Sequence, residues 1–139
     1  MKQHSDTLRV GTHGPGLVDI TDKAAQFVAA AKIGEGLLTL FIRHTSASLL
    51  VQENADPDVL TDLENFMRRT VGRDTALYRH TTEGRDDMPA HIRSALTQTS
   101  LAIPVRDGMM VLGTWQAIYV FEHRDRGYAR EIAAHVIGE

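Results

Sequence analysis

The sequence predicts an α+β fold, with a strand-rich core and two or three helices laid against it. Three observations lead to this prediction. The chain has 139 residues and a hydrophobic content of 42%, which suffices for one core. Short apolar runs of strand length alternate with stretches that carry helix-start signals. No repeat, low-complexity tract or linker divides the chain, so residues 1–139 are expected to form a single domain.

The first elements expected are two strands and a helix. Residues 7–10 and 17–20 are strand-like, and the glycine- and proline-rich residues 11–16 between them predict a turn, so the chain is expected to open with a hairpin. Thr21 is suited to cap a helix that runs to about Lys32, with apolar residues at helical spacing.

The middle of the chain predicts two buried strands and the strongest helix. Residues 37–44 and 46–52 are rich in apolar and β-branched residues, which is typical of buried strands. Asp56 followed by Pro57 is a helix start, because Asp accepts a free backbone N–H and proline needs none at the first position. The helix then carries one apolar stripe to near Arg69, formed by Val59, Leu60, Leu63, Phe66 and Met67.

The last third predicts a short helix followed by strands. Pro89 is expected to open a helix that ends near Leu96 and carries His91 in its first turn. Residues 101–105 and 109–112 flank Asp107 and Gly108, a strong signal for a tight hairpin. Two further apolar strands are expected over residues 115–122 and 130–137.

Composition excludes several classes of function. The net charge is −3, and no run of Lys or Arg offers the surface that nucleic-acid binding requires. No stretch approaches the roughly 18 apolar residues that span a bilayer, and the first residues lack the apolar segment of a signal peptide, so a cytoplasmic protein without membrane association is expected. Because the chain has no cysteine, any metal site must use His, Asp or Glu.

Three of the seven histidines lie beside clusters of polar residues. His44 follows a strand and precedes Thr45, His80 precedes Thr81 and Thr82, and His91 lies inside a helix. Three imidazoles that meet in the fold would suit Zn²⁺ and leave a coordination position open. Their spacing matches no local metal motif, so hydrogen-bonded histidines at strand ends remain the alternative.

Acidic and basic groups flank two of the predicted strands. Glu53 and Asn54 follow an apolar strand and have no evident capping role, which makes either one a candidate general base or ligand of a metal-bound water. Glu122 stands near several arginines, among them Arg124, whose planar guanidinium suits phosphate. Ordinary solvated surface explains this second group equally well.

Three long motifs resemble the YjbQ family, the proteins often called secondary thiamine-phosphate synthases. They are HTSASLLVQENADPDVLTDLE (44–64), EGRDDMPAHIRSAL (83–96) and SLAIPVRDGMMVLGTWQAIYVFEHR (100–124). They occur in the family's order, and the resemblance extends from about Leu8 to Gly138. One departure is Asp87, where relatives commonly carry Asn; a carboxylate there would add negative charge to a pocket.

The resemblance implies a β-sandwich-like core with two to three helices, assembled as a homotrimer. It also implies a pocket near a subunit boundary, in which His44, His80 and His91 are the metal ligands. The pocket wall that it implies contains Glu53, Asn54, Glu122 and Arg124. Within it we assign Glu53 and Glu122 as catalytic groups, and Asn54 and Arg124, with the hydroxyls of Thr45 and Ser46, as groups that bind substrate or phosphate.

The activity that the resemblance implies joins a phosphorylated thiazole to a pyrimidine diphosphate and releases pyrophosphate. A ligand set of histidines suits zinc better than magnesium, although magnesium commonly accompanies diphosphate departure and stays the alternative metal. Two other functions are consistent with the same residues. One is zinc-dependent hydrolysis with Glu53 or Glu122 as general base, and the other is a non-catalytic trimer that binds a small phosphorylated metabolite or a metal.

Overall fold

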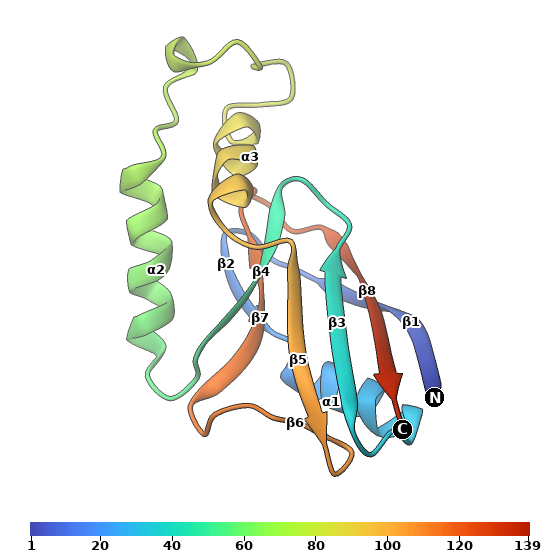
Figure 1. The fold of residues 1–139 in the computed structure, drawn as a ribbon. Coiled ribbons are helices and arrows are strands. Elements are labelled where there is room, and N and C mark those ends of the chain that lie inside the picture. Colours follow the sequence, from blue (N-terminus) through green and yellow to red (C-terminus); the bar gives the residue numbers. More distant parts are fainter.

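The computed structural model describes residues 1–139 as an α+β domain of eight strands, three α-helices and one short 3-10 helix at Thr75–Leu77 (Figure 1). The predicted fold class is therefore confirmed. One cluster of 19 buried apolar residues, drawn from both sheets and from helix α1, forms the core. None of the helices is long and apolar enough to cross a membrane.

Five strands form an antiparallel sheet in the order β1-β8-β3-β5-β6. Their bounds are β1 Lys2–Gly11, β3 Gly36–Ile42, β5 Ser100–Arg106, β6 Met109–Met110 and β8 Ala129–Gly138. Strand β5 alternates strictly, with Leu101, Ile103 and Val105 turned into the core and their neighbours exposed. This alternation is what a sheet with one face in solvent requires. The last strand in sequence, β8, pairs with both β1 and β3 and so lies inside the sheet.

Three strands form the second sheet, in the order β2-β7-β4. Their bounds are β2 Gly16–Asp19, β4 Ala47–Glu53 and β7 Gln116–Glu122. Strand β7 is central in this sheet and buried from Ala117 to Glu122. The two sheets share the core, as the expected sandwich-like arrangement requires.

The predicted opening hairpin is wrong. Strand β1 pairs with β8, and β2 pairs with β7, so the two neighbouring strands belong to different sheets. The turn between them was identified correctly, but a turn does not specify which strands pair. By contrast, the predicted hairpin at Asp107 and Gly108 is confirmed: both residues have positive φ, and β5 pairs with β6 on either side.

Helix α1 (Thr21–Ala31) buries Ala24, Phe27 and Val28 in the core. The N-cap position is Ile20, one residue before the predicted cap, and the Ile20 side chain makes no capping hydrogen bond. Asp19 Oδ1 accepts hydrogen bonds from both the backbone N–H and the hydroxyl of Thr21, at 2.8 and 2.6 Å, so Asp19 performs the capping role. The Thr21 hydroxyl in turn accepts from the backbone N–H of Ile118 in β7, which ties the helix to the second sheet.

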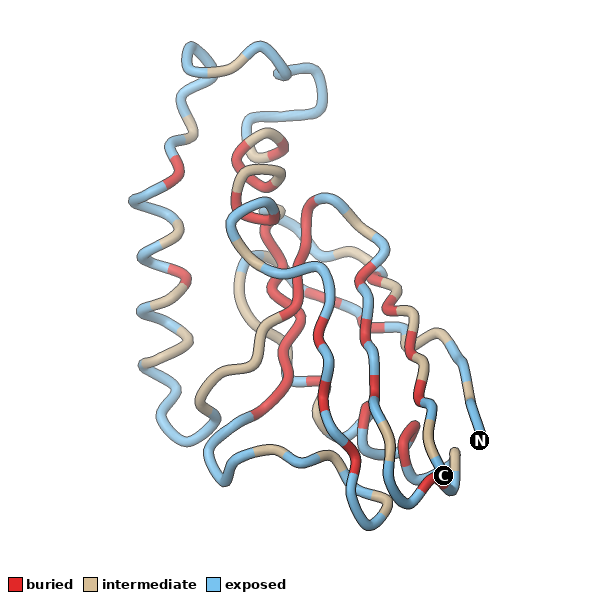
Figure 2. Tube along the Cα trace, in the orientation of Figure 1, coloured by how far each residue is buried: buried red, intermediate tan, exposed pale blue.

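Helix α2 (Pro57–Thr70) begins where the sequence predicts, with Asp56 Oδ1 accepting from the backbone N–H of Asp58. Its apolar stripe is only partly covered: Phe66 is 50% exposed, and the one buried side chain of the helix is Glu64. Figure 2 shows the helix at the side of the molecule, largely exposed along its length. Helix α3 (Asp87–Leu96) begins two residues before the predicted start and packs against β4.

Replacing Gly138 by alanine is expected to lower the free energy of unfolding by about 1–3 kcal/mol. Gly138 pairs with Gly36 across β8 and β3, and a Cβ atom at position 138 would lie 1.9 Å from the Glu35 carbonyl oxygen. Urea denaturation measures the loss. Gly11→Ala is the matched control, because a Cβ there meets nothing within 4 Å and should leave stability nearly unchanged. Equal effects of the two substitutions would contradict the prediction.

Candidate functional site

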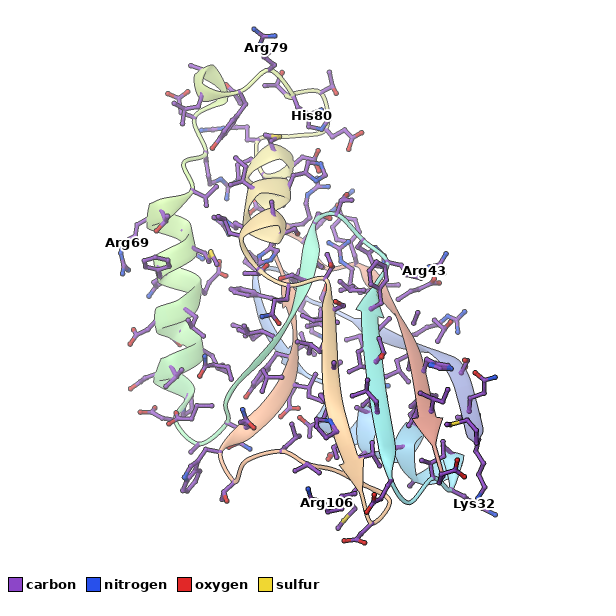
Figure 3. All side chains as sticks on the ribbon, in the orientation of Figure 1. Lys32, Arg43, Arg69, Arg79, His80 and Arg106 are labelled. Atoms are coloured by element: carbon purple, nitrogen blue, oxygen red, sulfur yellow. The ribbon has the colours of Figure 1, made fainter.

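Three segments that are distant in sequence meet at one end of the molecule. They are the start of β4, the first turns of α3, and the residues that follow β7. Helix α3 packs on β4, and the loop that leads into α3 carries His80, which Figure 3 shows beyond the amino-terminal end of the helix. Arg79, in the same figure, points outward from this loop.

His80, Asp87 and His91 bring their ligand atoms within 4.8 Å of one another. Asp87 Oδ2 lies 2.7 Å from His80 Nε2 and 3.1 Å from His91 Nε2. Asp87 and His91 share a helix face because they are four residues apart. The Asp87 side chain is 2% exposed, whereas His80 is 44% exposed, so the group has a buried carboxylate and an open side. Burial favours the neutral acid, but hydrogen bonds and charges from His80, His91 and Arg124 outweigh it and lower the pKa of Asp87.

The hydrogen bond at the other ring nitrogen of His91 determines its tautomer. Nδ1 lies 2.8 Å from the carbonyl oxygen of Thr45, which can only accept, so Nδ1 carries the hydrogen. In the neutral ring, Nε2 then presents a lone pair to the negatively charged Asp87 Oδ2. Two acceptors at 3.1 Å require a cation between them or a second proton on the ring. Nitrogen and oxygen atoms so arranged fit a divalent transition metal, whose ligands lie about 2 Å from the ion.

Arg124, a predicted phosphate ligand, is occupied by groups of its own chain. Its Nε donates to Asp86 Oδ2 at 2.8 Å, Nη1 lies 2.9 Å from Asp87 Oδ1, and Nη2 donates to the Glu83 carbonyl at 3.1 Å. The Arg124 side chain is only 15% exposed. These contacts leave the guanidinium little capacity to bind a phosphate. They also lower the pKa of Asp86 to about 2 despite its partial burial, chiefly through the hydrogen bond from Arg124.

A cavity of about 250 Å³ lies beside His91. The residues that line it are His44, Thr45, His91, Ser94, Ala95 and Thr99. Thr45, a predicted hydroxyl donor, therefore lines a cavity beside the group of His80, Asp87 and His91. Ser46 does not line this cavity; its buried hydroxyl accepts from Arg130 Nη2 at 3.0 Å.

His44 lies apart from the group of His80, Asp87 and His91. Its Nε2 accepts from the backbone N–H of Glu131 at 2.8 Å, and Nδ1 faces Arg130 Nη1 at 3.3 Å. Burial and the charge of Arg130 lower the pKa of His44. A neutral ring whose acceptor nitrogen is already engaged suits a cavity wall better than a metal ligand.

Glu122, predicted as a catalytic carboxylate, is buried inside the fold at 0% exposure. It accepts from Thr12 Oγ1 at 2.6 Å, from Arg130 Nε at 2.8 Å, and from the backbone N–H groups of His123 and Arg124. Each carboxylate oxygen is thus paired. This geometry makes Glu122 the partner of Arg130 in a buried ion pair and leaves no free lone pair for proton transfer to a substrate.

Glu53 and Asn54 lie at the other end of β4 from Thr45. Strand β4 spans Ala47–Glu53, and its length of roughly 20 Å separates them from the end that carries Thr45. Their neighbours are Tyr119, whose hydroxyl donates to the Glu53 carbonyl, and Trp115, whose carbonyl accepts from the Asn54 N–H. Within one chain, neither residue lies beside the group of His80, Asp87 and His91.

Sequence reasoning missed a polar layer beneath α3. His123 Nε2 lies 2.8 Å from the Ser48 hydroxyl, and Arg93 Nη1 donates to Glu64 of α2 at 3.4 Å. His123 is 2% exposed, and burial, together with the charges of Arg93 and Arg130, lowers its pKa to about 3. Asp87 was noticed only as a departure from the family pattern. The available signal was its spacing of four residues before His91, which places both on one helix face.

Comparison with known proteins identifies the same family over almost the whole chain. The model described as UPF0047 protein YjbQ-like matches residues 6–139. UPF0047 protein sll1880 of Synechocystis is 52% identical over 138 residues, covering 99% of this chain and 94% of that protein. UPF0047 protein YjbQ of Escherichia coli O157:H7 is 43% identical over 137 residues, covering 98% and 99%.

Solved structures give the same result. A YbjQ-like protein of unknown function from Sulfolobus solfataricus superposes with a TM-score of 0.90 at 26% identity, covering 99% of each chain. The conserved hypothetical protein TT1486 from Thermus thermophilus superposes with a TM-score of 0.83 at 34% identity, covering 95% of this chain and 99% of that one. The arrangement of strands and helices around the cluster is thus that of experimentally determined relatives.

Proposed function

Because the chain belongs to the UPF0047 YjbQ-like family, we propose that its function depends on a divalent metal held by His80, Asp87 and His91. The observation that carries this proposal is the 3.1 Å approach of His91 Nε2 to Asp87 Oδ2, with Nδ1 fixed by the Thr45 carbonyl. A cation bound by both atoms removes the repulsion between them. The exposed side of His80 leaves room for a substrate or water as a further ligand.

Zinc is the metal that this donor set favours. Imidazole nitrogens and a carboxylate suit Zn²⁺ and similar transition metals, whereas Mg²⁺ prefers oxygen ligands and retains several waters. The carboxylate of Asp87 strengthens the site, because it brings a negative charge to the cation. Although burial raises the pKa of Asp87, the hydrogen bond with His80 and the charges of His91 and Arg124 lower it below its ordinary value, so the carboxylate is ionised.

The substrate that we propose is a small phosphorylated metabolite that enters from the cavity beside His91. The cavity offers the hydroxyls of Thr45, Ser94 and Thr99, and its volume of about 250 Å³ suits a compact molecule. A bound zinc would neutralise the phosphate oxygens as a Lewis acid. Thr45 and the cavity hydroxyls would orient the substrate by hydrogen bonds.

The reaction that we propose is the one implied by the family resemblance. A phosphorylated thiazole nitrogen forms a bond to the methylene of a pyrimidine diphosphate, and the C–O bond to the diphosphate breaks as pyrophosphate departs with the electron pair. This displacement needs stabilisation of the leaving charge rather than a general base. Hydrolysis is less well supported, because Glu122 is paired with Arg130 and Glu53 lies at the far end of β4.

The first test is the metal content of protein purified without an affinity tag. We expect about one zinc per chain in the wild type and its loss in His91→Ala. His44→Ala is the matched control: it removes an imidazole from the same cavity but from outside the proposed ligand group, so it should retain the metal. A wild type without metal, or equal loss in both variants, would contradict the proposed ligand set.

The second test separates the possible reactions. Release of pyrophosphate only when both phosphorylated thiazole and pyrimidine diphosphate are present would support the transferase. Release of phosphate or pyrophosphate from one substrate alone would instead indicate a hydrolase. Tight binding of either substrate without turnover would indicate the non-catalytic binding role.

We also propose that the chain functions as a homotrimer. The support is the set of large apolar side chains that one chain leaves exposed, which includes Phe66, Leu77, Leu96 and Trp115, at 50–64%. Light scattering coupled to gel filtration measures the assembly. A stable monomer at micromolar concentration would overturn this part of the proposal without affecting the metal site.

A further inference from the structure

We infer that Arg124 is the positioning residue of the metal site, because it holds the Asp87 carboxylate so that only Oδ2 faces the ligand group. This inference rests on the proposed metal site and deepens it. Arg124 follows β7, whereas Asp87 and His91 belong to α3, so the contact joins two elements that are distant in sequence. Nη1 lies 2.9 Å from Asp87 Oδ1, and Oδ2 is the oxygen that faces both histidines.

The geometry of Arg124 is fixed on both sides. Its Nε donates to Asp86 Oδ2 at 2.8 Å, and the same oxygen accepts from the backbone N–H of Asp125 at 2.9 Å. Its Nη2 donates to the Glu83 carbonyl, which anchors the loop before α3. Because the guanidinium is planar, the contacts of Nε and Nη2 also fix the position of Nη1, which then lies against Asp87 Oδ1. The carboxylate therefore has a defined rotation about its χ2 angle.

The charges in this arrangement balance. Asp86 neutralises the guanidinium, so Arg124 supplies orientation to Asp87 without bringing a large net positive charge toward a metal. Because Oδ1 is engaged by Nη1, Asp87 would bind a metal through Oδ2 alone. This leaves more of the coordination sphere open than a bidentate carboxylate would. Loss of a group that hydrogen-bonds to a metal ligand, as Arg124 does to Asp87, typically weakens metal affinity by about 10- to 100-fold.

The test uses Co²⁺, added to metal-free full-length protein, and reads both affinity and the visible absorption of the ion. Without Arg124, Asp87 can rotate and offer both oxygens, which raises the coordination number and weakens the absorption bands. We expect Arg124→Met to bind Co²⁺ about 10- to 100-fold more weakly and to show the weaker, altered spectrum. Arg124→Lys keeps the charge but cannot bridge Asp86 and Asp87, so we expect its loss of Co²⁺ affinity to be intermediate. This variant should also fold more readily than Arg124→Met, because it retains a cation beside the two carboxylates.

Arg126→Met is the matched control. Arg126 lies against the same Tyr128 ring as Arg124, at 5.4 Å against 5.5 Å, but donates to the Tyr128 hydroxyl rather than to a carboxylate. It should leave Co²⁺ affinity and spectrum unchanged. If wild type binds Co²⁺ and both Arg124 variants match it in affinity and spectrum, the positioning role is wrong while the metal site stands. If wild type does not bind Co²⁺, both the proposed function and this inference fail.

Discussion

Acidification from pH 6.5 toward pH 3 is expected to destabilise the fold by on the order of 4 kcal/mol through His123 alone. The folded-state pKa of His123 is about 3, whereas the ordinary value is 6.5. Below pH 6.5 the unfolded chain therefore binds a proton that the folded chain excludes, and each pH unit costs about 1.4 kcal/mol. The contribution of the neutral ring is complete above pH 6.5 and is lost as the pH falls.

The cause of this shift is the polar layer beneath α3. Burial removes His123 from water, and the nearby positive charges of Arg93 and Arg130 oppose a second one. His44 adds to the loss in the same direction, because its pKa is also lowered by burial and by Arg130. Asp86 contributes only at lower pH, since its pKa falls from 3.8 to about 2. Glu64 acts in the opposite direction, because burial raises its pKa above 4.5 and the folded chain then binds a proton at a higher pH than the unfolded chain. The loss of stability as the pH falls below 6.5 therefore comes from His123 and His44.

Urea denaturation at a series of pH values between 7 and 4.5 measures this loss. His123→Gln should lower stability at pH 7 and flatten the dependence on pH. His135→Gln is the control, because His135 is only partly buried on β8 and its ring forms a hydrogen bond with Gln3 near the surface. An unchanged slope in His123→Gln would show that another group causes the acid sensitivity.

Replacing Arg130 by methionine is expected to lower the free energy of unfolding at pH 7 by about 3–5 kcal/mol. Arg130 is 4% exposed, and its partner Glu122 is fully buried. The substitution keeps most of the side-chain volume but leaves the Glu122 carboxylate without its counter-charge. It also removes the donors to Ser46 and the neighbour of His44, so the wall of the cavity should loosen.

A comparison of two ion pairs isolates the effect of burial. Arg43 pairs with Glu131 at 3.3 Å, but the two side chains are 60% and 40% exposed. Arg43→Met should therefore cost less than about 1 kcal/mol. The double variant with Arg130→Met and Glu122→Gln should recover part of the loss, because it removes the unpaired charge. Equal losses for Arg130→Met and Arg43→Met would contradict the assignment of Glu122 to a structural role.

Local sequence signals predicted the elements well but not their partners. Asp56 and Pro57 start α2, and Asp107 and Gly108 turn the β5–β6 hairpin, because these residues act on their own backbone. The pairing of β1 with β8 depends on residues more than a hundred positions away, which no local pattern specifies. The same limit explains why the first two strands were wrongly joined in a hairpin.

The candidate site was predicted only in part, because several of its contacts also join segments that are distant in sequence. Histidines are conspicuous, and two of the three singled out, His80 and His91, do meet. Whether His44 joins them depends on the ring contacts with Arg130 and Glu131, which arise only when β8 lies beside β3. The burial of Glu122 could not be predicted from the sequence, because it follows from the central place of β7 in its sheet. Arg124 was judged free for phosphate because its acidic partners come from a segment almost forty residues earlier.

The place of β8 also has a consequence for biosynthesis. Strands β1 and β3 leave the ribosome early. Strand β1 pairs with β8, and β3 pairs with β5 on one edge and with β8 on the other, so both need residues 129–138, which emerge after every other strand. Until then, both strands present unpaired backbone groups that can associate with other chains. We therefore expect the larger sheet to form after most of the chain has been translated. Until then, we expect chaperones to keep β1 and β3 from pairing with the same strands of other nascent chains on the polysome.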